Sequence, residues 1–394
     1  MKAKPPNQRS TAVRDDGVRQ SNNAAGAAEP GAGTPAQRPA MTDVARVAGV
    51  SHMTVSRVLN EPELVRPLTR ARVMAAIEQL GYRPNLAARA LVTGRTQTLG
   101  VVTFDTTLYG PASTLYGIEQ AATHEGYSVT VAAVSAIDRN SVHDAVSRLV
   151  SQGVDGVILV VPLMSAADAI AGVAKDVPLV VVEGDPGVGL PVVMCDQFTG
   201  AKSATEYLLD SGHETVWHVA GPSNWMESEG RLSGWRAALE AAKAEQPPPI
   251  YGDWSAKSGY EAGAILARMP DVTAVFAAND QMALGVMRAF TERGRKIPAE
   301  VSVIGFDDIP EAAYFTPPLS TVRQDFARVG ENAIRLIIEQ IDSGEVSSAK
   351  IVIDSVLVTR DSTAPRSGGG STAAARRNSA GATNRRADRQ VRRG

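Results

Sequence analysis

The strongest constraint on the fold is the stretch VARVAGVSHMTVSRVLN at residues 44–60. Small apolar residues recur at helical spacing before Gly49, and a glycine just past a helix end readily takes the left-handed conformation that closes the helix. Ser51 follows as a candidate N-cap for a second helix. Two short helices joined by so tight a turn predict either a helix-turn-helix, whose second helix enters the DNA major groove, or an ordinary helical hairpin.

The longer stretch MTDVARVAGVSHMTVSRVLN, residues 41–60, resembles the DNA-binding signature of the LacI/GalR family of transcriptional regulators, which favours the helix-turn-helix. The resemblance implies a set of DNA-contacting positions in this segment: Thr42, Ser51, His52, Met53, Thr54, Ser56, Arg57 and Asn60. His52 and Met53 stand where a lactose-type member of the family has tyrosine and glutamine. Because this pair reads base edges, we predict a different operator sequence.

Charge limits nucleic-acid contact to part of the chain. The whole chain has a formal net charge of −2, whereas residues 41–95 hold eight Arg against four acidic residues. The one cysteine, Cys195, excludes an intrachain disulfide and fits a reducing compartment. No apolar run is long enough to span a bilayer, and the N-terminus has no apolar signal core. We therefore expect a cytoplasmic protein without a membrane span.

Composition predicts disorder at both ends of the chain. Residues 1–40 are rich in Ala, Gly, Pro and Arg without periodicity, and a translation start at Met41 stays an alternative to Met1. Residues 362–394 are expected to form an Arg-rich disordered tail, which either adds salt-sensitive DNA affinity or is simply solvated. The tail has no leucine heptads of the kind through which a family member tetramerises, so the resemblance implies a homodimer.

Residues 41–84 are predicted to form a headpiece of three helices, the third capped by Thr69 and ended by Gly81. Residues 85–96 hold a short Ala-rich helix that is too short to be stable alone in water, followed by a linker. By resemblance this is a hinge helix that orders on operator DNA, while a plain linker is the alternative. The implied DNA contacts of the hinge are Asn85, Ala88 and Leu91, of which Leu91 would wedge into the minor groove.

From residue 97 the pattern changes to short apolar runs that alternate with amphipathic helices. The runs lie at 99–104, 127–133, 156–161, 178–183, 216–221, 274–278 and 301–308, and a last strand is expected over 350–358. Continuous apolar strands between helices predict parallel sheets covered on both faces. Residues 97–361 exceed one such sheet, so we predict an α/β fold with two doubly wound parallel-sheet subdomains, similar to periplasmic binding proteins. Ligands of such sheets bind at the carboxyl ends of the strands.

Three motifs in this domain, GDWSAKSGY, ANDQMALGVMRA and PPLSTVRQDF, also resemble lactose-type members of the family. By composition alone, each polar or aromatic residue in them could be a helix cap or a core residue. The resemblance implies the following effector contacts: Leu108, Pro111, Glu183, Arg231, Trp254, Asn279, Asp307 and Phe326. These residue types suit a sugar, because sugars need bidentate polar partners and an aromatic face. The resemblance implies that the sugar is galactoside-like. Two departures are Glu183 in place of aspartate and Val160 in place of asparagine.

These observations predict a repressor that binds double-stranded, palindromic operator DNA as a homodimer and is released by a small sugar. A corepressor-dependent regulator and a sugar receptor without DNA function are the alternatives. An enzyme is disfavoured, because the chain has no HExxH, no GxSxG nucleophile elbow and no P-loop. His213 and His218 flank the start of a predicted strand and are expected to be structural. We therefore expect no cofactor and no metal site.

Overall fold

The computed structural model describes residues 39–83, 90, 94–134, 139–160, 177–184 and 189–366. The chain divides into two compact units, Met1–Asn85 and Leu86–Gly394. The first contains the headpiece and the second the α/β domain, which we call the core domain. No helix in the described ranges is both long enough and apolar enough to cross a membrane.

The headpiece contains helices α1 (Met41–Ala48), α2 (His52–Asn60) and α3 (Pro67–Leu80) with a short 3-10 turn η1 (Pro62–Leu64). Gly49 closes α1 with φ 64°, and the Ser51 hydroxyl accepts a hydrogen bond of 3.1 Å from the Thr54 amide. The α1–α2 turn is held from the third helix, since the Arg72 guanidinium donates to the carbonyls of Ala48 and Gly49. The predicted helix-turn-helix is thus confirmed.

The third helix begins earlier than predicted. Pro67 is its first residue and Arg66 its N-cap, so the prediction that Thr69 caps it is wrong. Proline suits this position because the first amide of a helix has no intrahelical acceptor, and its fixed φ is already helical. Val44, Val55 and Val73, one from each helix, are fully buried against one another in a small core.

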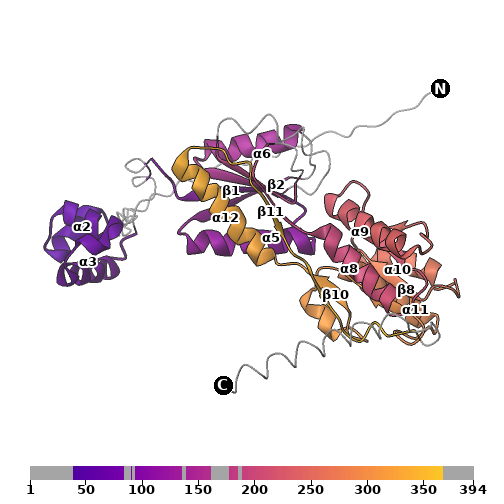
Figure 1. Ribbon diagram of the computed structural model, residues 1–394. Coiled ribbons are helices and arrows are strands. Elements are labelled where there is room, and N and C mark those ends of the chain that lie inside the picture. The colour runs from indigo at the N-terminus through magenta and orange to yellow at the C-terminus, as the bar shows by residue number, and fades with distance from the viewer. Residues whose placement is uncertain are drawn as a thin grey trace, which may run out of the picture. The chain divides into compact units, whose positions relative to one another are not determined.

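The amino-terminal part of the core domain, the N-subdomain, is built on a six-stranded parallel sheet (Figure 1). Its strands are β1 (Thr98–Phe104), β2 (Ser128–Val134), β3 (Gly156–Val160), β4 (Leu179–Val182), β5 (Val192–Cys195) and β11 (Lys350–Ile353), in the order β11-β5-β4-β3-β1-β2. Helices α5 (Tyr109–His124) and α12 (Phe326–Ser343) cover one face, and α6 (Arg139–Ser151) packs on the other. The buried apolar strands are explained by this cover on both faces.

The other part, the C-subdomain, has a four-stranded parallel sheet with the order β7-β6-β8-β9. Its strands are β6 (Trp217–Ala220), β7 (Ile250–Tyr251), β8 (Ala274–Ala277) and β9 (Ser302–Ile304). Helices α8 (Gln197–Asp210) and α9 (Met226–Ala242) pack on one face, and α10 (Ala256–Leu266) and α11 (Asp280–Glu292) on the other. A 3-10 helix, η3 (Pro310–Tyr314), follows β9. The prediction of two doubly wound subdomains is confirmed.

The final predicted strand, 350–358, is two strands in different subdomains. β11 extends the large parallel sheet beside β5, whereas β12 (Val356–Val358) pairs antiparallel with β10 (Thr321–Arg323). Asp354 and Ser355 separate the two apolar stretches, but both stretches are strands and the sequence analysis joined them into one. The chain thus passes between the subdomains near residues 196, 325 and 354, which brings the carboxyl ends of both parallel sheets to one cleft.

The ordered domain extends past the predicted boundary at residue 361. Ser362 is fully buried, and its hydroxyl donates to Val303 O (2.6 Å) and accepts from the Ser320 amide (2.7 Å). The Arg366 amide donates to Ser211 O at 2.8 Å. The assignment of residues 362–366 to a disordered tail is therefore wrong, because they satisfy backbone groups of neighbouring segments.

Candidate functional site

A cavity of about 230 Å³ lies between the two subdomains of the core domain. The loop after β1 and the start of α5 contribute Leu108 and Pro111, and the C-subdomain contributes Trp225, Trp254 and Asn279. A smaller hollow of about 30 Å³ lies beside it. The hollow shares Pro111 and Arg231 with the cavity and is also lined by Glu183 and Phe326. The two together form the cleft that the strand topology predicts.

All eight predicted effector residues line this cleft. Six line the main cavity: Leu108, Pro111, Arg231, Trp254, Asn279 and Asp307. Glu183 and Phe326 line the smaller hollow instead. Residues separated by more than a hundred positions in the chain therefore converge, as the motif resemblance implied. Val160, where the family pattern differs, also lines the hollow and offers it only an apolar surface.

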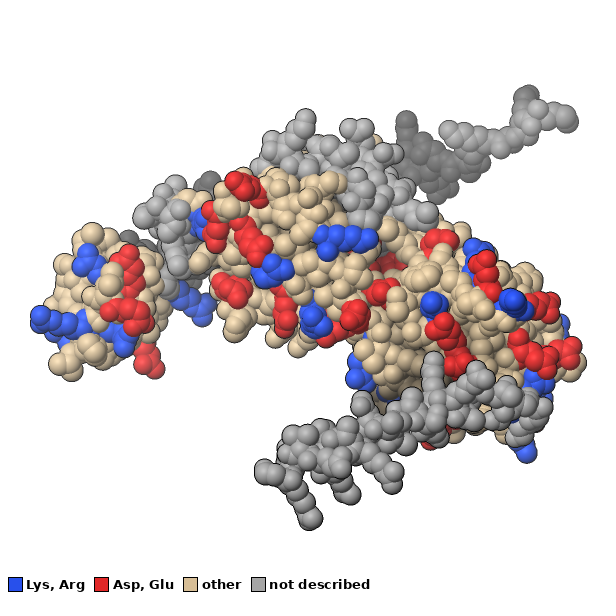
Figure 2. All heavy atoms as spheres, in the orientation of Figure 1, with Lys and Arg blue, Asp and Glu red and all other residues tan. Residues whose placement is uncertain are grey.

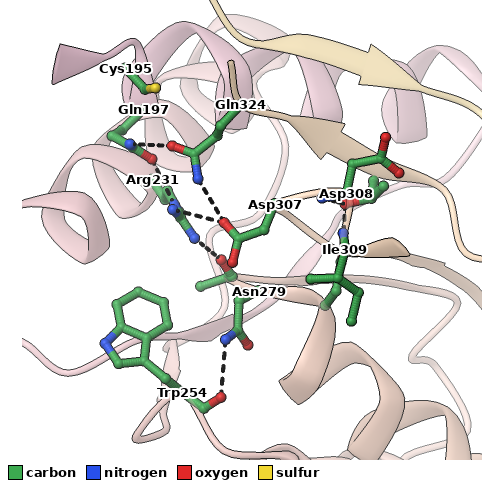
Figure 3. Close-up of polar contacts among 12 residues, drawn as sticks. Cys195, Gln197, Arg231, Trp254, Asn279, Asp307, Asp308, Ile309 and Gln324 are labelled. Atoms are coloured by element: carbon green, nitrogen blue, oxygen red, sulfur yellow. Dashed lines mark hydrogen bonds and ion pairs between the residues drawn. The ribbon is translucent and has the colours of Figure 1, made fainter. Parts of the chain in front are cut away.

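Arg231 is the centre of a buried hydrogen-bonded network (Figure 3). Its Nε donates to Gln197 Oε1 at 2.8 Å, its Nη1 donates to Ala278 O, and its Nη2 lies 3.2 Å from Asp307 Oδ1. The guanidinium carbon also lies 3.9 Å from the centre of the Phe306 ring. A guanidinium fixed on this many sides is held ready for a ligand.

Two glutamines complete this network, and the sequence analysis missed both. Gln324 Nε2 donates to Asp307 Oδ1 at 2.7 Å, and Gln197 Nε2 donates to Gln324 Oε1 at 2.7 Å. Both lie where the chain passes between subdomains, at the start of α8 and just before α12. Gln324 falls inside the motif PPLSTVRQDF, which was the available signal for it. The network therefore joins two of the three crossing segments, those near residues 196 and 325, to the cleft.

Asn279 has a structural role as well as a place in the cavity wall. Its Oδ1 caps α11 by accepting from the Met282 amide at 2.9 Å, and its Nδ2 donates to Trp254 O at 3.0 Å. The helix-cap alternative is therefore correct, and the side chain also fixes the backbone of Trp254. Trp254 is only 7% exposed, and its Nε1 has no hydrogen-bond partner among the described residues.

The backbone is strained at three of the predicted contacts. Glu183, Trp254 and Asp307 have φ of 55°, 71° and 107°, in the region that disfavours residues with a Cβ. Each such conformation costs about 1–3 kcal/mol and is typical of functional sites. In this chain the strained residues follow strands β4, β7 and β9, at the edge where the sheets face the cleft.

Three carboxyl groups line the cleft, and burial changes their acidity. Burial raises the pKa of Glu183 to about 7, although its Oε1 accepts a 2.8 Å hydrogen bond from the Cys195 amide. Burial raises the pKa of Asp307 to about 6, against the opposing effect of the Arg231 charge. Glu227, one turn before Arg231 on α9, was not predicted, and burial raises its pKa well above the ordinary value. Its Oε2 is buried with no partner among the described residues.

The headpiece exposes most of the predicted DNA-contacting side chains. Thr42, Ser51, His52, Met53, Arg57 and Asn60 are exposed, and Thr54 and Ser56 are half-buried. Met53 is 68% exposed, so its side chain is accessible to a binding partner. Figure 2 shows Arg side chains on the headpiece surface. The three hinge predictions, Asn85, Ala88 and Leu91, lie outside the described residues.

A helix-turn-helix followed by a two-subdomain α/β domain with a polar cleft defines a DNA-binding regulator that responds to a small ligand. The family described as bacterial regulatory proteins, lacI family, matches residues 40–85, and the periplasmic binding protein-like domain matches residues 205–363. The chain belongs to the LacI family, and it is a DNA-binding transcriptional repressor with a periplasmic-binding-protein-like domain.

Individual relatives support the same assignment. The lactose operon repressor of Escherichia coli (strain K12) is 33% identical over 82% of this chain and 89% of its own length. The regulator CelR of Thermobifida fusca is 34% identical over 83% of this chain and 98% of its own. The solved lac repressor dimer bound to operator and the anti-inducer ONPF has a TM-score of 0.74 and 32% identity over 83% of this chain and 100% of that one. These relatives are regulators, so the prediction that the chain is not an enzyme is confirmed.

Proposed function

We propose that this protein binds a palindromic operator as a homodimer, represses transcription there, and is released by a galactoside-like sugar bound in the cleft. The observation that carries the proposal is the convergence of Arg231, Asp307 and Trp254 on one cavity. Because its target is chromosomal DNA, we expect it to act in the cytoplasm.

The chemistry of the cleft suits a sugar. Arg231, Asp307 and Asn279 are planar groups that can pair with adjacent hydroxyls, and Trp254 offers an aromatic wall for the C–H face of a sugar ring. Solved structures of relatives include a lac repressor bound to ONPG and a CelR–cellobiose complex. Glu183 and Val160 line the smaller hollow, so we expect them to alter which hydroxyl groups are recognised.

The exposed face of α2 would read the operator. His52 and Met53 lie in its first turn and Arg57 one turn later, where a recognition helix presents side chains to the major groove. Arg57 can bind guanine O6 and N7, worth about 1–3 kcal/mol of discrimination, and Met53 can contact a thymine methyl group. Thr42, Ser51, Thr54, Ser56 and Asn60 complete this surface, in which Ser51 and Thr54 already bond each other through their hydroxyls.

The hinge and the dimer complete the proposed complex. Asn85, Ala88 and Leu91 would order on the DNA, with Leu91 inserted between base pairs of the minor groove. For the dimer, apolar side chains stay exposed on the C-subdomain: Ile265 on α10 is 53% exposed and Leu284 on α11 is 42% exposed. A relative of this chain is described as a dimer in its solved structure.

Release by the sugar would follow from linkage. A ligand changes operator affinity only as far as it binds the two states of the protein differently. The cleft lies between two subdomains, so a sugar that contacts both favours one arrangement of them. If the hinges fit the operator in the other arrangement, sugar binding weakens DNA binding.

Fluorescence anisotropy of a labelled palindromic fragment from beside the gene would test the proposal. The protein should raise the anisotropy, and one member of a galactoside panel should reverse the rise. Tighter binding on addition of a sugar would indicate a corepressor instead. Sugar binding with no operator found by binding-site selection would leave only the receptor alternative. Loss of DNA binding on deletion of residues 41–84 is the control for the headpiece.

A further inference from the structure

The charges in the cleft do not balance. The charged side chains among the described residues that line the cavity and the hollow are Glu183, Glu227, Asp307 and Arg231. Arg231 and Asp307 are paired at 3.2 Å. Two carboxyl groups are left, and no second cation lines the cleft among the described residues.

Glu227 is the less satisfied of these two. Glu183 accepts the Cys195 amide, whereas Glu227 Oε2 is buried without a partner among the described residues. A buried carboxylate oxygen without a donor is costly, and two neighbouring carboxylates in a low-dielectric site do not both ionise readily. Burial, followed by the charge of Glu183, raises the pKa of Glu227 well above its ordinary value. The protonated form of Glu227 is therefore favoured, and a cation bound beside this side chain would displace its proton.

The aromatic lining of the cavity is also suited to a cation. Trp225 and Trp254 both line it and meet edge to face, with ring centres 5.7 Å apart. Indole faces attract cations, and the Arg231 guanidinium carbon already lies 5.4 Å from the Trp254 ring centre. The same rings can stack on the C–H face of a sugar.

The remaining unpaired polar atoms set the pattern of donors and acceptors in the ligand. Gln281 Oε1, a second buried acceptor in the cavity wall, has no described partner. Trp254 Nε1 is a hydrogen-bond donor that has no acceptor among the described residues, and its side chain is only 7% exposed. A ligand should thus offer donors to Glu227 and Gln281 and a hydroxyl oxygen to Trp254.

We propose that the effector is an amino sugar whose protonated amine binds against Glu227, on the side of the cleft where Glu183 also lies. An ammonium group and a sugar hydroxyl both donate hydrogen bonds, but only the ammonium group also supplies the missing positive charge. The inference rests on the proposed function, and it specifies which class of sugar the cleft selects.

Isothermal titration calorimetry of the full-length protein with matched pairs would test this inference. Each pair joins a neutral hexose to its 2-amino-2-deoxy or 6-amino-6-deoxy form, in the galactose and glucose series, and N-acetyl derivatives serve as neutral nitrogen controls. In at least one pair the amine should bind tenfold tighter or more than its neutral partner, which corresponds to about 1.4 kcal/mol. Titration in two buffers of different ionisation enthalpy should show a proton released with the amine only.

Glu227→Gln keeps the size of the side chain and removes its charge. It should bring the ratio of amine to neutral affinity close to one. Glu229→Gln is the matched control on the same helix, because Glu229 interacts with Ser233 and does not line the cleft. Thermal unfolding of both variants would verify that each is folded.

The outcomes separate the two proposals. Neutral sugars that bind as tightly as their amines, or tighter, in every pair would overturn the amine inference and leave the sugar effector intact. An unchanged affinity ratio in Glu227→Gln would also overturn it. If no sugar of either kind binds, the sugar effector itself is wrong and the amine inference fails with it.

Discussion

Gly221 provides a sharp test of the cavity wall, because a single added methyl group there must displace Trp254. A Cβ at Gly221 would lie 2.3, 2.5 and 2.6 Å from three carbons of the Trp254 indole. Carbon atoms in contact normally stay about 3.5–4.0 Å apart, so the ring has to move by about 1 Å or more. The Trp254 backbone is held by Asn279 and the ring lies against Trp225. The space available to the ring is therefore the cavity itself.

Gly221→Ala should thus affect both stability and sugar binding. Overpacking of this kind costs about 1–3 kcal/mol, and in a domain of this size each kcal/mol lowers the Tm by roughly 2–4 °C. The displaced indole would occupy part of the 230 Å³ cavity, so effector affinity should fall at least tenfold. Differential scanning calorimetry and sugar titration measure the two effects.

Gly110→Ala is the matched control for stability. Gly110 also lines the cavity, but a Cβ there meets no atom within 4 Å, so the Tm should stay close to the parent value. If Gly221→Ala kept both the Tm and the sugar affinity of the parent, the position assigned to Trp254 in the cavity wall would be wrong.

Three further predictions concern the headpiece, the hinge and the core. Leu91→Ala should weaken operator binding in anisotropy titrations while sugar affinity stays, and equal loss of both would mean that the fold was damaged. Exchange of His52 and Met53 for Tyr and Gln should move operator preference toward a lactose-type site in a binding-site selection, and an unchanged preference would contradict their base-reading role. His218 is buried, and burial lowers its pKa to about 4. Below its unfolded pKa of about 6.5 the unfolded chain takes up a proton that the folded chain does not, so stability falls between about pH 6.5 and 4, by up to about 3 kcal/mol. The parent should therefore lose stability relative to His218→Phe when urea unfolding is repeated across this range, and parallel pH profiles would refute the assignment.

The sequence predicted the headpiece well because its signals are local. A glycine that closes a helix and a serine that caps the next act within a few residues, and Gly49 and Ser51 do so as expected. The exception was α3, where Pro67 at the first position gave an earlier start than Thr69. Local capping rules thus identified the helices more reliably than their first residues.

The core domain was predictable in its type and less so in its details. Long buried strands such as β1 and β3 appear as apolar runs, but β5, β7 and β10 have four, two and three residues and were missed. Length alone is not the reason, because β4, β6 and β8 have four residues each and were predicted. The missed strands depend on hydrogen bonds from their neighbours, which no local pattern records. The division of 350–358 into β11 and β12 has the same cause.

The cleft shows the same limit for side chains. Arg231, Asn279 and Asp307 were identified through motif resemblance, since nothing in their local pattern separates a ligand contact from a helix cap. Gln197 and Glu227 lie in no motif, and the position of Gln197 depends on its hydrogen bonds with Arg231 and Gln324. A glutamate one turn from Arg231, on the same face of α9, was the signal that could have found Glu227.

The return of the chain to the N-subdomain through α12 and β11 sets the order in which the molecule can be completed during synthesis. The headpiece is contiguous and can fold as soon as it leaves the ribosome. The N-subdomain sheet, in contrast, lacks α12, one of the two helices that cover one of its faces, and the edge strand β11 until residues near 353 have been made. Until then the part of this apolar face that α12 covers stays exposed while the C-subdomain forms. The DNA-reading unit is therefore complete in the nascent chain before the effector-binding unit is.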